Sequence, residues 1–176
     1  QQKADFICYT VGLENSPDVI ASKKTAQLLG LKHKIKEYSL EEAEELFKKT
    51  VKLFDNADVL TIGVGAVVYA AVELAKPDKV TKFFSGLGSE EIFAGYERHL
   101  KAKDKHQECW NGMKAMWRRD IVRGNILAEK LNFESLDPFL DDEVIKSAMG
   151  IDISRKIIET QKKIILREIA EELGLP

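Results

Sequence analysis

The segment FFSGLGSEEIFAGYERH (residues 83–99) decides the fold: an apolar run passes through a glycine turn into an acidic, amphipathic stretch. This order predicts a buried strand, a tight turn and a helix. Upstream, residues 5–11 (DFICYTV) form a second apolar, β-branched run that stops at Gly12. Ser16 and Pro17 then supply an N-cap and a first helical residue, and Gly30 supplies a C-terminal stop. Both segments therefore predict a strand followed by a helix.

The residues between these two segments repeat the alternation. Residues 32–38 alternate weakly and predict an edge or near-edge strand, and the Ser39-Leu40-Glu41-Glu42 stretch begins a helix as a capping box does. Residues 59–75 are apolar almost all round, which predicts a helix buried against a sheet. Strands that alternate with helices specify a parallel sheet with right-handed crossovers, so we expect a doubly wound α/β core.

The second half of the sequence has a different pattern. We expect one domain over residues 1–176, with an α/β part at 1–99 and a helical part at 100–176. No convincing strand follows Leu100, and the predicted helices lie near 103–118, 119–131, 141–149 and 155–173.

Composition excludes several classes of protein. The 27 basic and 29 acidic residues give a net charge of −2, so we expect small-molecule or protein partners and no nucleic acid. Cys8 and Cys109 are too few for a disulfide framework, which favours a reducing cytoplasm. Because no apolar run approaches the roughly 18 to 20 residues that span a bilayer, we also expect a soluble protein with no membrane partner.

The glycine turn at 83–99 also carries chemistry. Gly86 and Gly88 let a ligand approach the backbone, Ser85 adds a hydroxyl, and free amides at a helix start can face an anion. Glu90 and Glu91 would repel a bare phosphate unless Mg²⁺ lay between them, so metal-bound ATP is the simplest ligand. The alternative is a plain tight turn followed by carboxylates that the helix dipole favours.

Other candidate groups have simpler interpretations. The isolated His106-x-x-Cys109 pair more simply belongs to a solvated helix face than to a metal site. Arg98 and His99 are more readily explained by the helix dipole than by phosphate binding. We expect the remaining candidates to be structural: a core pair, Trp110 and Trp117; a polar stretch, Arg118, Arg119, Asp120, Arg123 and Asn125; and two solvated lysine clusters, at residues 32–36 and 101–105.

Four segments resemble the synthetase domain of the asparagine synthetase family, within the adenine nucleotide alpha-hydrolase-like superfamily. Residues 85–96 are similar to the motif S-G-E-G-A/S-D-E-L-F-G-G-Y, and residues 9–18 to a strand ending in V-G-x-x-x-S-x-D. Residues 138–141 resemble the P-F-L-D element, and residues 163–167 resemble a K-x-x-L-R helix that runs into L-P. The segments occur in family order over nearly the whole chain.

The resemblance implies a site and a reaction. Val11 and Gly12 would line an adenine pocket through their backbone, and Ser85, Gly86 and Gly88 would contact the nucleotide. Glu90 stands where the family has a magnesium-associated Asp. The family adenylates a carboxylate with ATP and Mg²⁺, releases pyrophosphate, and lets ammonia displace AMP. The strand-end rule for open α/β sheets supports the same placement of the nucleotide.

The chain departs from the family pattern in three places. The S-G-G-x-D-S pyrophosphate loop is not in the sequence, Leu87 replaces a Glu beside the reacting substrate, and the R-x-K segment does not follow Pro176. The sequence also contains no glutaminase domain. We therefore expect residues 1–176 to be a core that lacks functional loops, because it begins at Gln1 without Met.

The sequence supports two possible functions, one catalytic and one not. The first is an ATP-dependent, amide-forming ligase acting on aspartate or a related acid, with ammonia from a separate source and a possible homodimer or separate glutaminase subunit. The second is a nucleotide-binding or partner-binding module that has lost catalysis. Because of Leu87, a lactam-forming or other carboxylate-adenylating relative is a further alternative within the enzyme class.

Overall fold

The protein, seen here as a computed structural model, is described for residues 5–56 and 58–175 and is a mixed α/β chain, mostly helical. The chain divides into two compact units. Unit 1 comprises Gln1–Lys82 and Arg123–Glu134, and unit 2 comprises Phe83–Val122 and Ser135–Pro176. The predicted boundary between residues 99 and 100 does not coincide with these bounds.

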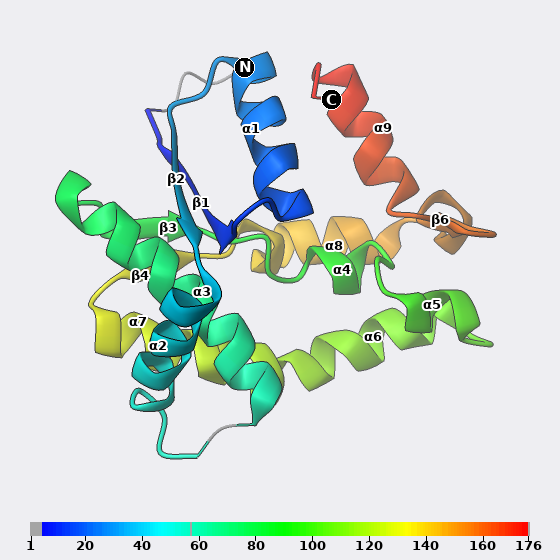
Figure 1. Ribbon diagram of the computed structural model, residues 1–176. Coiled ribbons are helices and arrows are strands. Elements are labelled where there is room, and N and C mark those ends of the chain that lie inside the picture. The colour runs from blue at the N-terminus through cyan, green and yellow to red at the C-terminus, as the bar shows by residue number, and fades with distance from the viewer. Residues whose placement is uncertain (1–4, 57, 176) are drawn as a thin grey trace. The chain divides into compact units, whose positions relative to one another are not determined.

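Unit 1 begins with a strand, a helix and a parallel strand, as the sequence predicts (Figure 1). Strand β1 (Cys8–Leu13) pairs with β2 (His33–Tyr38) in a register that joins Cys8 to His33 and Leu13 to Tyr38. Helix α1 (Pro17–Leu29) connects them and ends at Gly30, whose φ of 62° suits a residue without a side chain. These elements form one strand-helix-strand unit.

Helix α2 (Leu40–Val51) begins with the predicted capping box. The Glu42 amide donates to Ser39 Oγ at 3.2 Å, and the Ser39 amide donates to Glu42 Oε2 at 2.9 Å. Two amide donors that a helix start would leave free are thereby satisfied.

Helix α3 (Val59–Ala75) is the apolar helix, but only part of its surface is buried. Small residues such as Ala66 and Ala70 are buried, and the helix contacts β1, β2 and α2. The predicted burial against a sheet therefore holds for one side of the helix, whereas Val59 is 88% exposed and Leu60 71% exposed. An apolar helix with small residues on one side buries that side against a sheet, because the small side chains allow close packing.

The length of this apolar segment also corrects the sequence analysis. Val59–Asp78, which includes the 3-10 turn η1 (Lys76–Asp78), has 20 residues and a mean hydropathy of 1.7, so by length and composition it could cross a membrane. A core helix passes the same test, and 28% of the segment is buried inside the protein. The segment therefore decides nothing about a membrane.

The third predicted strand does not join the first two. Strand β3 (Lys82–Phe84) pairs with β4 (Glu134–Leu136), a strand that the sequence did not predict, which follows helix α7 (Val122–Leu131). Among the residues that the structure describes, β1 pairs with β2 alone. The described residues thus form two-stranded sheets, of which β1–β2 is parallel, and a continuous doubly wound sheet is not seen among them.

Unit 2 contains the segment 83–99, which forms two short helices. Helix α4 (Ser89–Ile92) ends where Ala94 adopts a φ of 56°, and α5 (Glu97–Lys101) follows Gly95. Helix α6 (Lys105–Met116) then continues into a π-helical turn, η2 (Trp117–Ile121). The helix predicted from residues 103 to 118 therefore ends in a widened turn.

The last part of unit 2 includes a hairpin that the sequence analysis missed. The 3-10 turn η3 (Pro138–Leu140), helix α8 (Asp142–Gly150) and the turn η4 (Ile153–Arg155) precede strands β5 (Ile157–Ile158) and β6 (Gln161–Lys162). Helix α9 covers Ile164–Glu172, so the predicted helix over 155–173 starts later than expected. Glu159, at the hairpin turn, has a φ of 48°, which no helix accepts.

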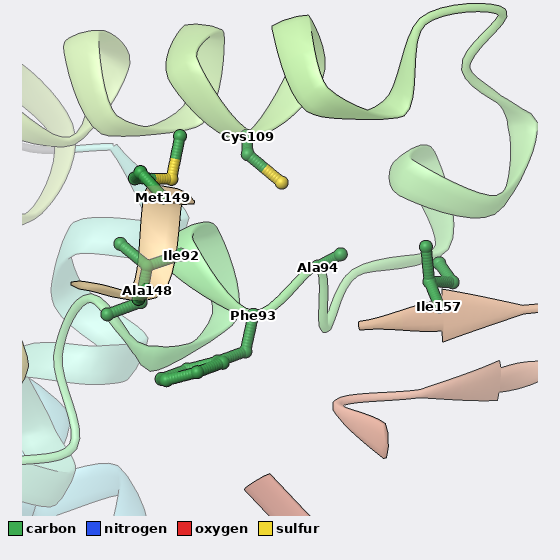
Figure 2. Close-up of a cluster of buried hydrophobic side chains, with 7 residues drawn as sticks. All are labelled: Ile92, Phe93, Ala94, Cys109, Ala148, Met149 and Ile157. Atoms are coloured by element: carbon green, nitrogen blue, oxygen red, sulfur yellow. The ribbon is translucent and has the colours of Figure 1, made fainter. Parts of the chain in front are cut away.

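The core of unit 2 gathers around the 92–94 segment. Figure 2 shows Ile92, Phe93 and Ala94 below helix α6, with Cys109 pointing toward them. Phe93 meets Phe139 edge to face, at a centroid distance of 6.2 Å. The residues directly after the glycine turn are thus anchored by burial.

Candidate functional site

A cavity lies at the carboxyl end of the β1–β2 pair in unit 1. Its volume is about 370 Å³, and Val11, Gly12 and Leu13 line it together with Tyr38. Helices α2 and α3 close it with apolar side chains such as Phe47 and Val67. Because ligands of open α/β sheets bind beyond the carboxyl ends of the strands, this cavity has the position expected of a nucleotide base.

Gly12 is required by the packing of helix α1. A Cβ at this position would lie 2.8 Å from Ser16 Oγ and 2.9 Å from Val19 Cγ2. Ser16 is the N-cap residue, but its hydroxyl makes no capping bond and has no partner within the part of the chain that the structure describes. Gly12 therefore lets the helix start close over the strand end.

The motif loop in unit 2 is a compact turn. The Leu87 amide donates to Ser85 Oγ at 2.9 Å, and the Ser89 amide donates to the Gly86 carbonyl at 3.2 Å. The amides of Glu91 and Ile92 both donate to the Gly88 carbonyl at 3.1 Å. These amides are used inside the loop, so the expectation that they face an anion is wrong for them.

The two motif glycines have different roles. Gly88 has a φ of 94°, and a Cβ there would lie 2.5 Å from Leu140 Cδ2, so the fold itself requires this glycine. Gly86 has no positive φ, and a Cβ there would meet nothing within 4 Å. The open surroundings of Gly86 leave room for a ligand beside the backbone.

Glu90, the candidate metal ligand, is paired with a lysine. Its carboxylate forms an ion pair with Lys163, a residue with a φ of 55° at the start of α9. Gly95 makes room for the pair, because a Cβ there would lie 2.6 Å from Lys163 Cε and still closer to the Glu90 carboxylate. The sequence analysis noted Lys163 in the K-x-x-L-R element but did not connect it with Glu90.

Glu91 lies in a buried network of charges. Its side chain is 1% exposed, and Arg119 Nη2 donates to its Oε1 at 2.7 Å. Arg119 also donates from Nε to Asp120 Oδ2 at 2.7 Å. The Asp120 hydrogen bond, followed by that of Glu91, raises the pKa of the Arg119 guanidinium. The polar stretch at 118–120 is therefore structural at Arg119, as predicted.

Tyr96 lies at the edge of the same network. The Arg98 guanidinium stands 4.1 Å from the Tyr96 ring centroid, and the His99 ring stacks on Tyr96 at 5.8 Å. Arg98 Nε contacts Glu108 Oε1 at 3.0 Å. His99 is fully buried and accepts the Tyr96 amide at Nδ1, and this burial lowers its pKa. Arg98 and His99 thus lie in the last turn of the five-residue helix α5, and His99 also caps the start of that helix through the Tyr96 amide.

The structure also places the two tryptophans and the cysteine that the sequence singled out. Trp110 is 39% exposed and Trp117 60% exposed, so the prediction that they belong to the core is wrong. Cys109 is fully buried, so the prediction that it lies on a solvated helix face is wrong, and this burial raises the pKa of its thiol. Across residues 5–56 and 58–175 there is no group of three or more His, Cys, Asp or Glu side chains that could hold a metal ion.

Similarity to known proteins extends over the whole chain. The family model described as asparagine synthase matches residues 1–112 and 100–176. The chain is 33% identical over 165 residues to a Methanocaldococcus jannaschii protein provisionally named asparagine synthetase [glutamine-hydrolyzing] 1, covering 90% of this chain and 30% of that protein. It is 34% identical over 154 residues to asparagine synthetase [glutamine-hydrolyzing] 2 of Lotus japonicus, covering 86% and 26%. The chain therefore spans less than a third of the length of these curated relatives.

Proposed function

Because the chain belongs to the asparagine synthase family, we propose that it is part of an ATP-dependent, amide-forming ligase. In the proposed reaction a carboxylate oxygen attacks the α-phosphorus of ATP, and the bond to pyrophosphate breaks. Ammonia then attacks the acyl carbon, and AMP leaves with the oxygen that came from the carboxylate. Aspartate or a related acid is the proposed substrate.

The cavity at the end of β1 and β2 is the observation that carries the proposal. We assign the adenine base to this cavity, with the backbone of Val11 and Gly12 beside it. Its apolar lining suits a flat aromatic base, and its volume falls in the range of small-molecule sites. A doubly wound sheet remains part of this proposal, because within residues 5–56 and 58–175 β1 pairs with a strand on one side only, and a further strand could pair on its other side.

We assign nucleotide contacts in unit 2 to Ser85, Gly86 and Gly88. The open space at Gly86 supports an approach of the ligand to the backbone there. The Ser85 hydroxyl already accepts the Leu87 amide, and a hydroxyl has a proton left to donate to a phosphate oxygen. Gly88 acts by holding the turn.

Glu90 is the carboxylate proposed to hold Mg²⁺. Mg²⁺ on ATP takes most of its ligands from water and phosphate oxygens and needs one or two carboxylates from the protein. One carboxylate that is a third exposed fits that donor set, provided that Lys163 moves to another partner. When bound, the ion would neutralise phosphate charge, and Lys163 would remain nearby as a second cation.

The proposal also covers the source of ammonia and the cellular location. The relatives are named as glutamine-hydrolysing, and we propose that ammonia reaches this chain from a glutaminase part or subunit. We also propose a homodimer and a cytoplasmic location.

Leu87 favours a second candidate within the enzyme class. A half-buried leucine cannot hydrogen-bond the polar groups of aspartate, so an acid with an apolar group at that point is a better match. A lactam-forming or other carboxylate-adenylating enzyme would satisfy this condition. A module without catalysis is the remaining alternative, because the Glu90–Lys163 ion pair leaves no free carboxylate there.

Blocking the cavity tests the proposed nucleotide site. Gly63 lines the cavity, and a Cβ there meets nothing within 4 Å, so Gly63→Leu should fill the space without disturbing the helix. The matched control is Gly124→Leu, at an equally open helical glycine that does not line the cavity. Calorimetry with AMP on the full-length protein should show weaker binding for Gly63→Leu alone. Equal AMP affinity in both variants would remove adenine from this cavity.

A further inference from the structure

The carboxylate of Glu91 is buried within a helix too short to hold itself in place. Helix α4 has four residues, and isolated helices of this length are unstable in water. Glu91 is 1% exposed, and Ile92 beside it is fully buried. The position of α4, and of Glu90 within it, therefore depends on what binds its buried side chains.

Arg119 is closer to the Glu91 carboxylate than Arg98 is. Its Nη2 lies 2.7 Å from Glu91 Oε1, whereas Arg98 Nη2 lies 3.7 Å from the same atom. Gly112 on α6 permits the approach, because a Cβ there would lie 3.0 Å from Glu91 Cγ and 2.9 Å from Arg98 Nη2. A buried carboxylate that loses its closest cation is strongly destabilised.

Arg119 lies in the π-helical turn η2. Neighbouring side chains on an α-helix point in different directions and do not meet. In η2, Arg119 bonds both its neighbour Asp120, at 2.6 Å from Nη2, and Glu91. Single π-turns of this kind occur often at functional sites, where they redirect a side chain.

We propose that Arg119 is a positioning residue for the motif loop. It fixes Glu91, and through α4 it sets the positions of Glu90 and of the Ser85–Gly88 turn. The role of this loop in nucleotide binding rests on the proposed function, whereas the positioning itself does not.

Hydrogen exchange on the full-length protein tests the positioning directly. The amides of Leu87, Ser89, Glu91 and Ile92 are bonded within the loop, so their exchange reports whether the loop holds its shape. We expect Arg119→Met to raise their exchange by about tenfold or more. The control is Arg118→Met, at the exposed neighbour, which should leave these amides unchanged. Arg119→Lys should restore part of the protection.

Two results would overturn the proposal. One is equal loop exchange in Arg119→Met and Arg118→Met. The other is an equal rise in exchange of the α8 amides in Arg119→Met, because that would indicate a general loss of stability.

Nucleotide binding by the same variants provides a separate test. If the proposed function holds, Arg119→Met should weaken ATP binding in Mg²⁺ by about tenfold, and Arg118→Met should not. Unchanged ATP binding in a variant with faster loop exchange would limit Arg119 to holding the turn and overturn its role toward Glu90. If wild-type protein binds no nucleotide, the proposed function fails, and the exchange result still decides the positioning.

Discussion

The Glu90 carboxylate is held by the Lys163 ammonium, and the pair fits only because Gly95 between them has no side chain. The lysine is paired with Glu90 Oε1, so Mg²⁺ would compete with the lysine for this carboxylate. The structure therefore links the candidate metal ligand to a lysine that lies 73 positions later in the sequence.

Replacing the Glu90 carboxylate should separate metal-dependent from metal-independent binding. Glu90→Gln is expected to weaken ATP binding in Mg²⁺ by about tenfold and to leave AMP binding nearly unchanged, because the carboxylate acts through the metal. Calorimetry with both nucleotides on the full-length protein measures this. Equal losses for ATP and AMP would give Glu90 a structural role only.

The two motif glycines should respond oppositely to alanine. Gly88→Ala should lower the free energy of unfolding by roughly 1 to 3 kcal/mol, because of the positive φ and the contact with Leu140. Gly86→Ala should change it by less than about 0.5 kcal/mol, yet weaken nucleotide binding. Thermal unfolding and calorimetry on both variants test this pair. Full nucleotide affinity in Gly86→Ala would show that no ligand approaches there.

Leu87 should make the protein a poor asparagine synthetase. Aspartate-dependent pyrophosphate release by the full-length protein is expected to be slower than about 1 s⁻¹, and Leu87→Glu should raise it. The matched control is Leu87→Met, which keeps an apolar side chain and should change little. Wild-type turnover within the ordinary range of about 1 to 10³ s⁻¹, with no gain from Leu87→Glu, would refute this.

Lys156 should make stability depend on pH. Its side chain is fully buried, with Nζ 4.0 Å from Met149 Sδ, and this burial lowers its pKa from 10.5. As pH falls below 10.5 the unfolded chain takes up a proton that the folded chain resists. The stability of the wild type should therefore decrease as pH falls and level off below the folded pKa.

Removing the amine should abolish this dependence. Lys156→Met is expected to be more stable than wild type at pH 7 by roughly 1 to 3 kcal/mol, with the gain shrinking toward pH 10. The control is Lys146→Met on the exposed face of α8, whose side chain is 70% exposed. Thermal unfolding at the two pH values measures the difference. A Lys156→Met protein less stable than wild type at pH 7 would reveal an anionic partner for the lysine.

Local sequence patterns predicted the elements of unit 1 well. The helix start after Ser16, the C-cap at Gly30, the Ser39 capping box and the parallel β1–β2 pair were predicted, although the Ser16 hydroxyl makes no capping bond. The family resemblance was confirmed by the comparisons. The nucleotide assignments at Val11, Gly12, Ser85, Gly86 and Gly88, and the metal assignment at Glu90, stay predictions.

The features that sequence reasoning missed depend on distant contacts or on very short elements. Strands β5 and β6 have two residues each, which is too short for any alternating pattern. The bonds of Glu91 to Arg119 and of Glu90 to Lys163 join segments far apart in the sequence, and no spacing rule links them. The π-turn at Trp117 likewise interrupts a pattern that reads as ordinary helix.

Transfer of a labelled oxygen tests the central claim most directly. The full-length protein would be given ATP, ammonia and an acid substrate labelled with ¹⁸O in the carboxylate, and the products would be analysed by mass spectrometry. If the carboxylate is adenylated, its oxygen stays with the leaving group when ammonia attacks, and the AMP that forms carries ¹⁸O. Product amide accompanied by unlabelled AMP, or by ¹⁸O in orthophosphate, would contradict adenylation.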